Sequence, residues 1–336
     1  MSRDELSSNG VTATSSPTTL TVVVVLHNSG DTLADCLSSI PDEAEIIVVD
    51  NASTDDGAAH ASRLRPSATV VRSEENVGFG GGCNVGLRHA TGDVVVFLNP
   101  DAVLIPHAVD RLVQVLNEDG VGMVGPAIIK PNGATEYSCR RWTRSWHALI
   151  EHLPYSDRWS PALLRRNIPA DSAIYRVGGR VAYVQGACMA LRADTLRSIG
   201  GFDEDFFLYG EEESIALRLR HLTKSCVYVP EAQALHVGGT STQRIGTRQS
   251  FHLWRSNVLL MRKRSAPARA MVDLLITAVA LVVALPTVCA RTALQRPTGL
   301  QLPSWLAAVE GFLSGARHPI SPAPQYRSAA ELASGP

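Results

Sequence analysis

Four short runs of apolar, mostly β-branched residues set the fold class of this chain. The runs are Thr21–Leu26 (TVVVVL), Glu45–Asp50 (EIIVVD), Ala68–Arg72 and Val94–Leu98 (VVVFL), and segments with helical spacing separate them. Runs that are apolar on both faces are typical of strands buried inside a parallel sheet. Because strands that alternate with helices indicate βαβ units, we predict an α/β fold.

The same pattern continues further along the chain. Strand-like runs cover Gly122–Pro131, Val181–Leu191 and Lys224–Val229, and Pro230 is expected to end the last of them. Residues 193–199 have helical spacing, and an acidic loop followed by a helix is expected up to His221.

Composition excludes several classes of protein. The 336 residues are 45% hydrophobic and 19% charged, which is typical of a globular chain rather than a disordered one. Lys and Arg number 31 against 32 Asp and Glu, so the net charge of −1 creates no overall attraction to nucleic acid. The six cysteines are scattered without a C-x-x-C pair, which fits reduced thiols in a cytosol.

Changes in composition divide the chain into four regions. The first nineteen residues are rich in Ser and Thr and lack the apolar segment of a secretion signal, so we expect a disordered tail and a cytoplasmic protein. The predicted regions are a tail at 1–19, an α/β domain at 20–245, a helical, membrane-associated region at 246–318 and a flexible tail at 319–336.

One segment near the carboxyl terminus is apolar around every face of a helix. Leu274–Ala290 contains no charged residue, although Asp273 limits it upstream and Pro286 lies inside it. A membrane span needs about twenty such residues, so the segment is slightly short. Basic residues flank it on both sides. We favour a helix lying in the membrane interface, while a span and a helix packed in a protein core stay open.

Polar residues follow the expected strands. Ligands of open α/β sheets bind outside the carboxyl ends of the strands, where Asp50 and Asp101 lie. Asp50 could accept hydrogen bonds from a nucleobase or ribose, and the Asn99-Pro100-Asp101 segment could hold Mg²⁺ or Mn²⁺ against a diphosphate. A capping loop and a plain turn are the alternatives. His236 could join Asp101 at a cation, although a lone histidine is more often structural.

Two further segments concentrate glycine and acid. Asn76–Asn84 (NVGFGGGCN) is expected to be a loop that lets a ligand approach the backbone, or a tight turn before a helix. It does not match G-x-G-x-x-G, which argues against a nicotinamide-dependent oxidoreductase. Asp203–Glu213 contains six carboxylates, whose mutual repulsion raises some pKa values unless a cation intervenes. The alternative there is a solvated start of a helix.

Taken in order, these segments resemble the inverting glycosyltransferases of family 2, and most closely their bacterial rhamnosyltransferase-like branch. The resemblance covers roughly residues 21–242 and is carried by VVDNASTD (Val48–Asp55), NVGFGGGCN (Asn76–Asn84), LNPD (Leu98–Asp101), GGFDEDFFLY (Gly200–Tyr209) and HVGGTS (His236–Ser241). It implies a GT-A fold, which is a nucleotide-sugar-binding, Rossmann-like mixed sheet flanked by helices, with a carboxyl-terminal helical, membrane-proximal extension.

The resemblance also implies roles for individual residues. Residues on the donor side are His27, Asn28, Asp50, Asn51, Ser53, Asn76, Gly78, Phe79, Gly80, Asn84, Asn99 and Asp101. Asp101 and His236 would bind Mg²⁺ or Mn²⁺, and Asp203 and Tyr209 would lie on the acceptor side. Glu212 occupies the position of the family's catalytic aspartate, with Glu211 as the fallback base. Ser214 replaces a second aspartate of the family pattern.

The implied activity is a metal-dependent transfer of L-rhamnose from dTDP-L-rhamnose to a hydroxyl of a lipid-linked cell-envelope glycan. A carboxylate would remove the acceptor proton during a single inverting displacement. The expected partners are the nucleotide sugar, the lipid-linked acceptor and the inner membrane surface, with a homodimer allowed. We expect the Trp- and Arg-rich stretch 140–166 to contribute to the acceptor pocket. Because Glu212 and Ser214 depart from the pattern, a catalytically weakened relative acting as a partner or regulatory subunit is the alternative.

Overall fold

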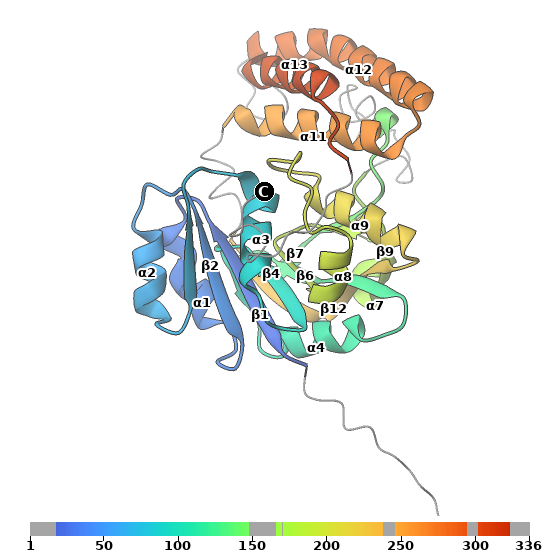
Figure 1. Ribbon diagram of the computed structural model, residues 1–336. Coiled ribbons are helices and arrows are strands. Elements are labelled where there is room, and N and C mark those ends of the chain that lie inside the picture. Colours follow the sequence, from blue (N-terminus) through green and yellow to red (C-terminus); the bar gives the residue numbers. More distant parts are fainter. Residues whose placement is uncertain (1–17, 148–165, 170, 238–245, 294–301, 323–336) are drawn as a thin grey trace, which may run out of the picture.

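The computed structural model describes residues 18–147, 166–169, 171–237, 246–293 and 302–322. Its centre is a ten-stranded mixed sheet in the order β3-β2-β1-β4-β11-β6-β12-β5, with β7 beside β6 and β9 beside β12 (Figure 1). The strands are β1 (Leu20–Leu26), β2 (Glu45–Asn51), β3 (Thr69–Ser73), β4 (Val94–Leu98), β5 (Ala102–Leu104), β6 (Val121–Ile129), β7 (Thr135–Glu136), β9 (Gly179–Val181), β11 (Cys188–Arg192) and β12 (Ser225–His236). The short strands β8 (Cys139–Arg140) and β10 (Tyr183–Val184) form a separate pair.

The first four strands form the parallel half of the sheet, as the sequence predicts. β1 pairs in parallel with β2 and with β4, and β2 pairs in parallel with β3. Register aligns Leu26 with Asp50 and Asp50 with Arg72, so the polar residues that follow these strands meet at one edge. β11 then joins β4 in the antiparallel sense and makes the sheet mixed.

Helices cover both faces of the sheet because successive strand residues point to opposite sides. Val22 and Val24 face the helices α1 (Leu33–Ser38), α2 (Gly57–Leu64) and α4 (Ala108–Leu116). Val23 and Val25 face α3 (Gly78–His89), α8 (Ala193–Ser198) and α9 (Glu211–His221). A short helix, α7 (Ile174–Val177), precedes β9 in the chain. The five cysteines of this domain are buried and unpaired, and Cys83 and Cys188 pack as small apolar residues.

From Gly78 onward the glycine-dense segment Asn76–Asn84 is the start of helix α3. The loop expected there from the sequence is therefore wrong. A Cβ atom at Gly82 would lie 2.6 Å from Cγ1 of Val25, and one at Gly86 would lie 2.3 Å from Cγ1 of Val23. Both distances are far below ordinary contact, so larger residues would push α3 away from β1. The glycines at 82 and 86 therefore serve close packing of a helix on a strand.

Strand β12 does not end at Pro230, which corrects a second expectation. It continues to His236, and its register with β6 shifts between Val229 and Gln233. A bulge of this kind accommodates a proline that cannot donate to the ladder. The extension brings His236 opposite Ala102, next to Asp101. The expected strand over 181–191 is likewise divided, into the end of β9, β10 and most of β11.

The carboxyl-terminal helices form a layer over one end of the α/β domain (Figure 1). They are α11 (Arg248–Arg264), α12 (Pro267–Ala293) and α13 (Leu302–Arg317). Trp254, Leu281 and Ala308 form the core of this layer. Phe206 of the acidic segment packs against Leu259 and Leu260 of α11, which attaches the layer to the domain.

Helix α12 continues through Pro286 and has two different faces. Over Pro267–Pro286 it is long and apolar enough to cross a membrane by length and composition. Asp273 and Thr277 are buried on the face that packs within the layer, whereas Leu275 and Val282 are 65% and 68% exposed. The helix is thus one-sided in its packing although its sequence is apolar all round.

Candidate active site

The residues that follow β2 organise the start of α3. The Asp50 carboxylate is buried, accepts a 2.9 Å hydrogen bond from the backbone of Ser53 and lies 3.2 Å from Nε of Arg72. The Asn51 amide donates to Oδ1 of Asn76 and to the carbonyl of Gly78, and its oxygen accepts from the backbone of residue 77. Asn51 and Asn76 therefore fix the amino end of α3 against the sheet.

The loop after β1 is tied to the loop after β2. Asn28 has a positive φ of 53°, and its Oδ1 accepts a 2.7 Å hydrogen bond from the backbone of Thr54. Its own backbone N–H donates to Oγ of Ser53, and Nδ1 of His27 lies 2.9 Å from the carbonyl of Asn51. The structure therefore brings the donor-side residues of these two loops together with the start of α3.

Helix α3 connects this edge to the acidic segment. The Asn84 amide donates to the carbonyl of Phe202 and to the Glu204 carboxylate, and its oxygen accepts from the backbone N–H of Phe202. The backbone N–H of Phe79 donates to the carbonyl of Phe207. Asn84 is buried in these contacts and thus joins two segments 118 residues apart.

Asp101 and His236 form a buried pair at the ends of β4 and β12. Oδ1 of Asp101 lies 3.2 Å from Nε2 of His236, and Oε2 of Glu136 lies 3.4 Å from Nδ1 on the other side of the ring. Burial alone would lower the pKa of His236, but the hydrogen bonds to Asp101 and Glu136 outweigh it and raise the pKa to about 9. Asn99 donates its backbone N–H to the carbonyl of Ala187 and aligns this loop with β11.

The Asp101 and His236 side chains are chemically suited to a divalent cation. Carboxylate oxygen and imidazole nitrogen are both ligands that Mn²⁺ accepts, and these two atoms already lie next to each other. Glu136 contacts the opposite ring nitrogen and so does not converge on the same point. Across the described ranges, no group of three or more His, Cys, Asp or Glu side chains could hold a metal ion. A cation here would need its remaining ligands from substrate and water.

Asp203 and Asp205 bind the helical layer. Nζ of Lys263, on α11, lies 2.7 Å from Asp203 and 2.6 Å from Asp205. Burial would raise the pKa of Asp205, but hydrogen bonds from Lys263 and Ser321 lower it to about 2. The structure thus gives Asp203, expected on the acceptor side, an ion pair that joins domain and layer. Tyr209 has a positive φ of 68° just before the turn into α9, and burial raises the pKa of its hydroxyl.

The three consecutive glutamates that begin α9 have different surroundings. Glu213 is fully buried and accepts a 2.8 Å hydrogen bond from the backbone of Thr143. Glu212 is half-buried, and its Oε1 accepts a 2.8 Å hydrogen bond from the backbone N–H of Gly186. Glu211 is buried, and within the described residues its Oε1 has no hydrogen-bond partner.

The ionisation of these glutamates differs accordingly. Burial and then the charge of Glu212 raise the pKa of Glu211 well above its ordinary value. Burial also raises the pKa of Glu212, while the Gly186 hydrogen bond and the positive charges of Arg166 and Arg140 oppose the rise. A carboxyl whose pKa is raised toward neutrality and that remains reachable is suited to proton transfer.

Sequence reasoning missed several residues that build this site. Gly186, Glu136 and Lys263 each contact a predicted site residue, and Thr143 contacts Glu213 beside the predicted base, but none of the four belongs to a motif. They meet their partners only through the fold, across 26 to 100 residues of chain. No signal in the order of residues alone identifies them.

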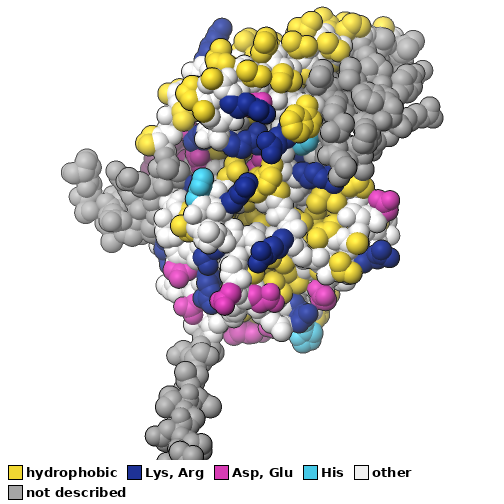
Figure 2. All heavy atoms as spheres, turned by 90° about the vertical axis from the view of Figure 1, so that its right-hand side faces the viewer, with side chains coloured by type: hydrophobic (Ala, Val, Ile, Leu, Met, Phe, Trp, Pro, Cys, Tyr) yellow, Lys and Arg dark blue, Asp and Glu magenta, His cyan; other side chains and the backbone are white. Residues whose placement is uncertain are grey.

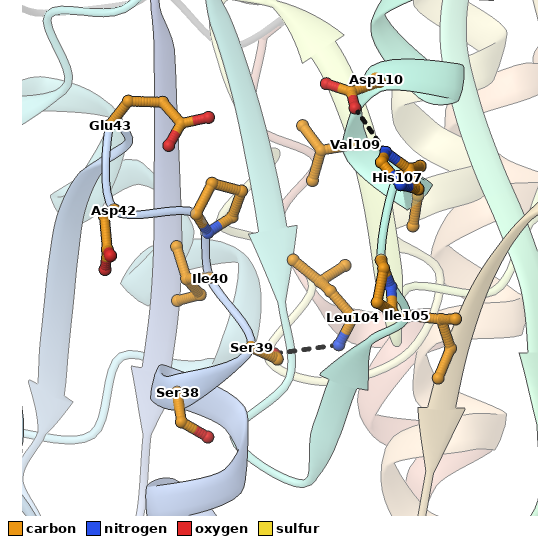
Figure 3. A pocket seen from close by; sticks show the side chains of 13 residues that line it. Ser38, Ser39, Ile40, Asp42, Glu43, Leu104, Ile105, His107, Val109 and Asp110 are labelled. Atoms are coloured by element: carbon orange, nitrogen blue, oxygen red, sulfur yellow. Dashed lines mark hydrogen bonds and ion pairs between the residues drawn. The ribbon is translucent and has the colours of Figure 1, made fainter.

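A cavity of about 290 Å³ lies elsewhere in the domain, between the end of α1 and the start of α4 (Figure 3). Its lining includes Ile40, Asp42, Leu104 and His107. Asp42 precedes β2, so the cavity lies toward the end of that strand opposite Asp50. No residue predicted for donor, metal or base lines it, and we assign it no part in the site.

Comparison with known proteins identifies the chain's relatives. An N-acetylglucosaminyl-diphospho-decaprenol L-rhamnosyltransferase of Mycobacterium tuberculosis is 27% identical over 246 residues, which are 67% of this chain and 78% of the relative. A mannosyltransferase, PcManGT of Pyrobaculum calidifontis, solved with GDP-Man and Mn²⁺, matches with a TM-score of 0.54 and 18% identity over 89% of this chain and 87% of that one. GalNAc-T7, solved with UDP, GalNAc and Mn²⁺, matches with a TM-score of 0.55 and 17% identity over 73% and 48%.

These two solved structures show that the fold is GT-A-like, with a mixed sheet flanked by helices. The sequence model of glycosyl transferase family 2 matches residues 21–198, which is more than half of the chain. The matched range contains the Asp50, Asn76–Asn84 and Asp101 segments. The chain therefore belongs to glycosyl transferase family 2.

Proposed function

We propose that this family 2 glycosyltransferase moves L-rhamnose from dTDP-L-rhamnose to a hydroxyl of a lipid-linked cell-envelope glycan. The Mycobacterium tuberculosis relative, whose name gives this sugar and a diphospho-decaprenol acceptor, supports the proposal at 27% identity. The transfer would occur at the cytoplasmic face of the membrane, where a nucleotide-sugar donor is available.

The edge of the sheet that carries Asp50 would bind the donor. Asp50 would accept hydrogen bonds from the base or ribose, and the start of α3 would line the diphosphate. Asp101 and His236 would hold Mg²⁺ or Mn²⁺, because they supply adjacent oxygen and nitrogen ligands. When bound, the cation would neutralise negative charge on the leaving diphosphate.

The single observation that carries the mechanism is the position of Glu212. Of the three glutamates at the start of α9, Glu212 combines a reachable carboxyl with a fixed backbone donor, the N–H of Gly186. Glu212 would accept the acceptor's hydroxyl proton while that oxygen forms a bond to the anomeric carbon. The bond from that carbon to the diphosphate breaks on the opposite side, so the configuration inverts.

The helical layer would attach the enzyme to the membrane surface. Leu275 and Val282 of α12 and Leu306 of α13 are each more than half exposed, and Figure 2 shows hydrophobic side chains along the upper surface. Because the other face of α12 packs within the protein and buries Asp273, we favour a helix lying in the interface over a spanning one. The same face could instead join two copies in a homodimer.

The test is turnover with a prenyl-diphosphate-linked N-acetylglucosamine acceptor and separate dTDP-, UDP- and GDP-sugar donors. We expect release of dTDP from dTDP-L-rhamnose and a loss of about 10²–10⁴-fold in Glu212→Gln. Glu231→Gln, an exposed change elsewhere, is the matched control. Full activity in Glu212→Gln would remove the assigned base, and turnover of only a UDP- or GDP-sugar would refute the donor. Higher turnover in Glu212→Asp would favour the catalytically weakened relative.

A further inference from the structure

Glu136 contacts the histidine of the proposed metal site from behind, and none of the sequence motifs contains it. Its Oε2 atom lies 3.4 Å from Nδ1 of His236. Oδ1 of Asp101 lies 3.2 Å from Nε2, the other nitrogen of the same ring. The imidazole is thus held between two carboxylates, although only one of them belongs to the site that the sequence predicts.

Three neighbouring strands bring Glu136 to this position. β7 lies beside β6 (Figure 1), and their register aligns Glu136 with Ile128. On its other side, β6 aligns Ile128 with Ala234 of β12, two residues before His236. Paired residues share a face of a sheet, and so do residues two apart on a strand. Glu136 and His236 therefore project from the same face, close enough for their side chains to meet across β6.

A tight turn holds Glu136 at a fixed distance from the sheet. The backbone N–H of Lys130 donates to the carbonyl of Ala134, and that of Gly133 donates to the carbonyl of Lys130. Gly133 has a positive φ of 78°, which glycine adopts without strain. Glu136 follows this closed hairpin directly, so its carboxyl reaches His236 from a fixed backbone rather than from a loose loop.

The backbone also aligns His236 with Asp101. The N–H of Val237 donates a 3.1 Å hydrogen bond to the carbonyl of Asp101, and the register of β12 with β5 places His236 opposite Ala102. These contacts set where the imidazole begins on the strand. They do not set which ring nitrogen carries a proton, because that choice follows from the side-chain acceptor that the ring meets.

The Glu136 carboxylate supplies such an acceptor. An ionised carboxylate only accepts hydrogen bonds, so the Nδ1 atom of His236 that faces it carries a proton. In a neutral ring the lone pair then lies on Nε2, the nitrogen beside Asp101. Histidines that bind metals generally donate their second N–H to a carboxylate, a carbonyl or water, which orients the ring and makes the ligating nitrogen more basic.

We propose that Glu136 is a positioning residue that orients His236 to bind Mg²⁺ or Mn²⁺ through Nε2. The inference rests on the proposed function for the cation site of Asp101 and His236. Glu136 contacts the ring on the side opposite Asp101, so it would act on the cation through the histidine rather than as a ligand. Its loss should therefore weaken the binding of the cation.

The test measures Mn²⁺ binding, which needs neither an acceptor nor turnover. Free Mn²⁺ is followed by electron paramagnetic resonance during titration of the full chain, with dTDP, UDP and GDP present in turn. We expect the affinity for Mn²⁺ to fall about 10–100-fold in Glu136→Leu. Glu136→Gln should show a smaller loss, of more than twofold, because its amide oxygen still accepts from Nδ1 but carries no charge.

Glu118→Leu is the matched control. Glu118 is exposed and precedes β6, whose first residue is aligned with the start of β12 rather than with His236 at its end. Its affinity for Mn²⁺ should stay within twofold of the wild type. Thermal unfolding in EDTA separates the proposal from a purely structural role, since an ion pair that only stabilises the fold would lower Tm without changing the affinity for Mn²⁺.

Two results would overturn the inference. One is an affinity for Mn²⁺ within twofold of the wild type in both Glu136 variants. The other is an equal loss in Glu136→Gln and Glu136→Leu, as large as that in Asp101→Ala, which would make Glu136 a ligand.

Failure of the proposed function is separable from failure of this inference. Glu136-dependent binding of Mn²⁺ with UDP or GDP but not with dTDP would retain the positioning role and refute the donor. Binding that is lost in Asp101→Ala but unchanged in Glu136→Leu would retain the metal site and refute the positioning role. A wild-type protein that binds no Mn²⁺ with any of the three nucleotides would refute both.

Discussion

Replacing Gly186 with alanine would move the carboxyl of Glu212 while leaving every catalytic group chemically intact. A Cβ atom at position 186 would lie 2.6 Å from Oε1 of Glu212, whereas ordinary contact begins near 3.4 Å. Because the close atom is the end of a flexible side chain, the glutamate can yield without a change in the backbone. The backbone of Gly186 lies outside the positive-φ region, so alanine meets no conformational strain there.

The size of the effect follows from these distances. The Glu212 oxygen must move by about 0.8 Å, and a displacement near 1 Å at a reacting group costs about a hundredfold in rate. We therefore expect kcat of Gly186→Ala to fall by about a hundredfold, with the donor KM unchanged. The free energy of unfolding should change by less than about 1 kcal/mol, because reduced freedom of the unfolded chain offsets a weakened hydrogen bond.

The assay is initial-rate kinetics combined with thermal unfolding, and a double-mutant cycle supplies the control. Aspartate at position 212 is one methylene shorter and withdraws the carboxyl from the added Cβ atom. Gly186→Ala should then cost much less in the Glu212→Asp background than in the wild type. If Gly186→Ala keeps full kcat, or if the two changes are simply additive, the Gly186 contact does not position the base and our reasoning is wrong.

Four further outcomes are expected. A ligand at one hundred times its Kd stabilises the folded protein by about 2.7 kcal/mol, which a thermal-shift assay detects. Asp101→Ala should abolish the part of the stabilisation by dTDP that depends on Mn²⁺. Retained Mn²⁺-dependent stabilisation would refute Asp101 as a metal ligand. Lys263→Met should lower the free energy of unfolding by about 3 kcal/mol in denaturant titrations, because it leaves the buried Asp203 carboxylate without its ion pair, while Asp205 keeps only Ser321 and His318. The pKa of Asp205 is about 2 in the folded state and about 3.9 when unfolded, so its stabilisation is complete above pH 5 and is lost as the pH falls through 2. The slope of unfolding free energy against pH in that range should be shallower in Lys263→Met. Leu275→Glu/Val282→Glu should reduce co-sedimentation with anionic vesicles at least tenfold without changing Tm, and undiminished binding would remove α12 from the membrane contact.

The parallel half of the sheet is predictable because its signal is local. Runs such as TVVVVL and EIIVVD need burial on both faces wherever they lie, so their neighbours hardly matter. The requirement for glycine in α3 cannot be predicted locally. It arises because Val23 and Val25, on a strand more than fifty residues earlier, leave no room for a Cβ atom. Pro230 is similar, because a bulge against β6 decides whether the strand can continue past it.

The residues of the candidate site likewise fall into those that local sequence patterns predict and those that depend on packing. Asp101 and His236 could be brought together by reasoning alone, because each was expected after a strand, although His236 in fact ends the extended strand β12. Gly186, Glu136 and Lys263 could not, since their contacts depend on how α9 and α11 pack on the domain. Sequence patterns indicate which groups are available, and packing selects the ones that meet.

The three glutamates of α9 show why identical residues need the structure to be told apart. Successive side chains of a helix point about 100° apart, so Glu211, Glu212 and Glu213 leave the same turn toward different neighbours. Glu211 faces α3, and burial followed by the charge of Glu212 raises its pKa well above the ordinary value, whereas Glu213 is held by Thr143 and the flanking arginines. Glu212 lies between these extremes, with one backbone donor and a reachable carboxyl. Environments that push the pKa values of neighbouring carboxyls apart are how enzymes assign different roles to the same chemical group. Changing the residues that contact these three glutamates, rather than the glutamates themselves, would therefore move the role of base from one glutamate to another.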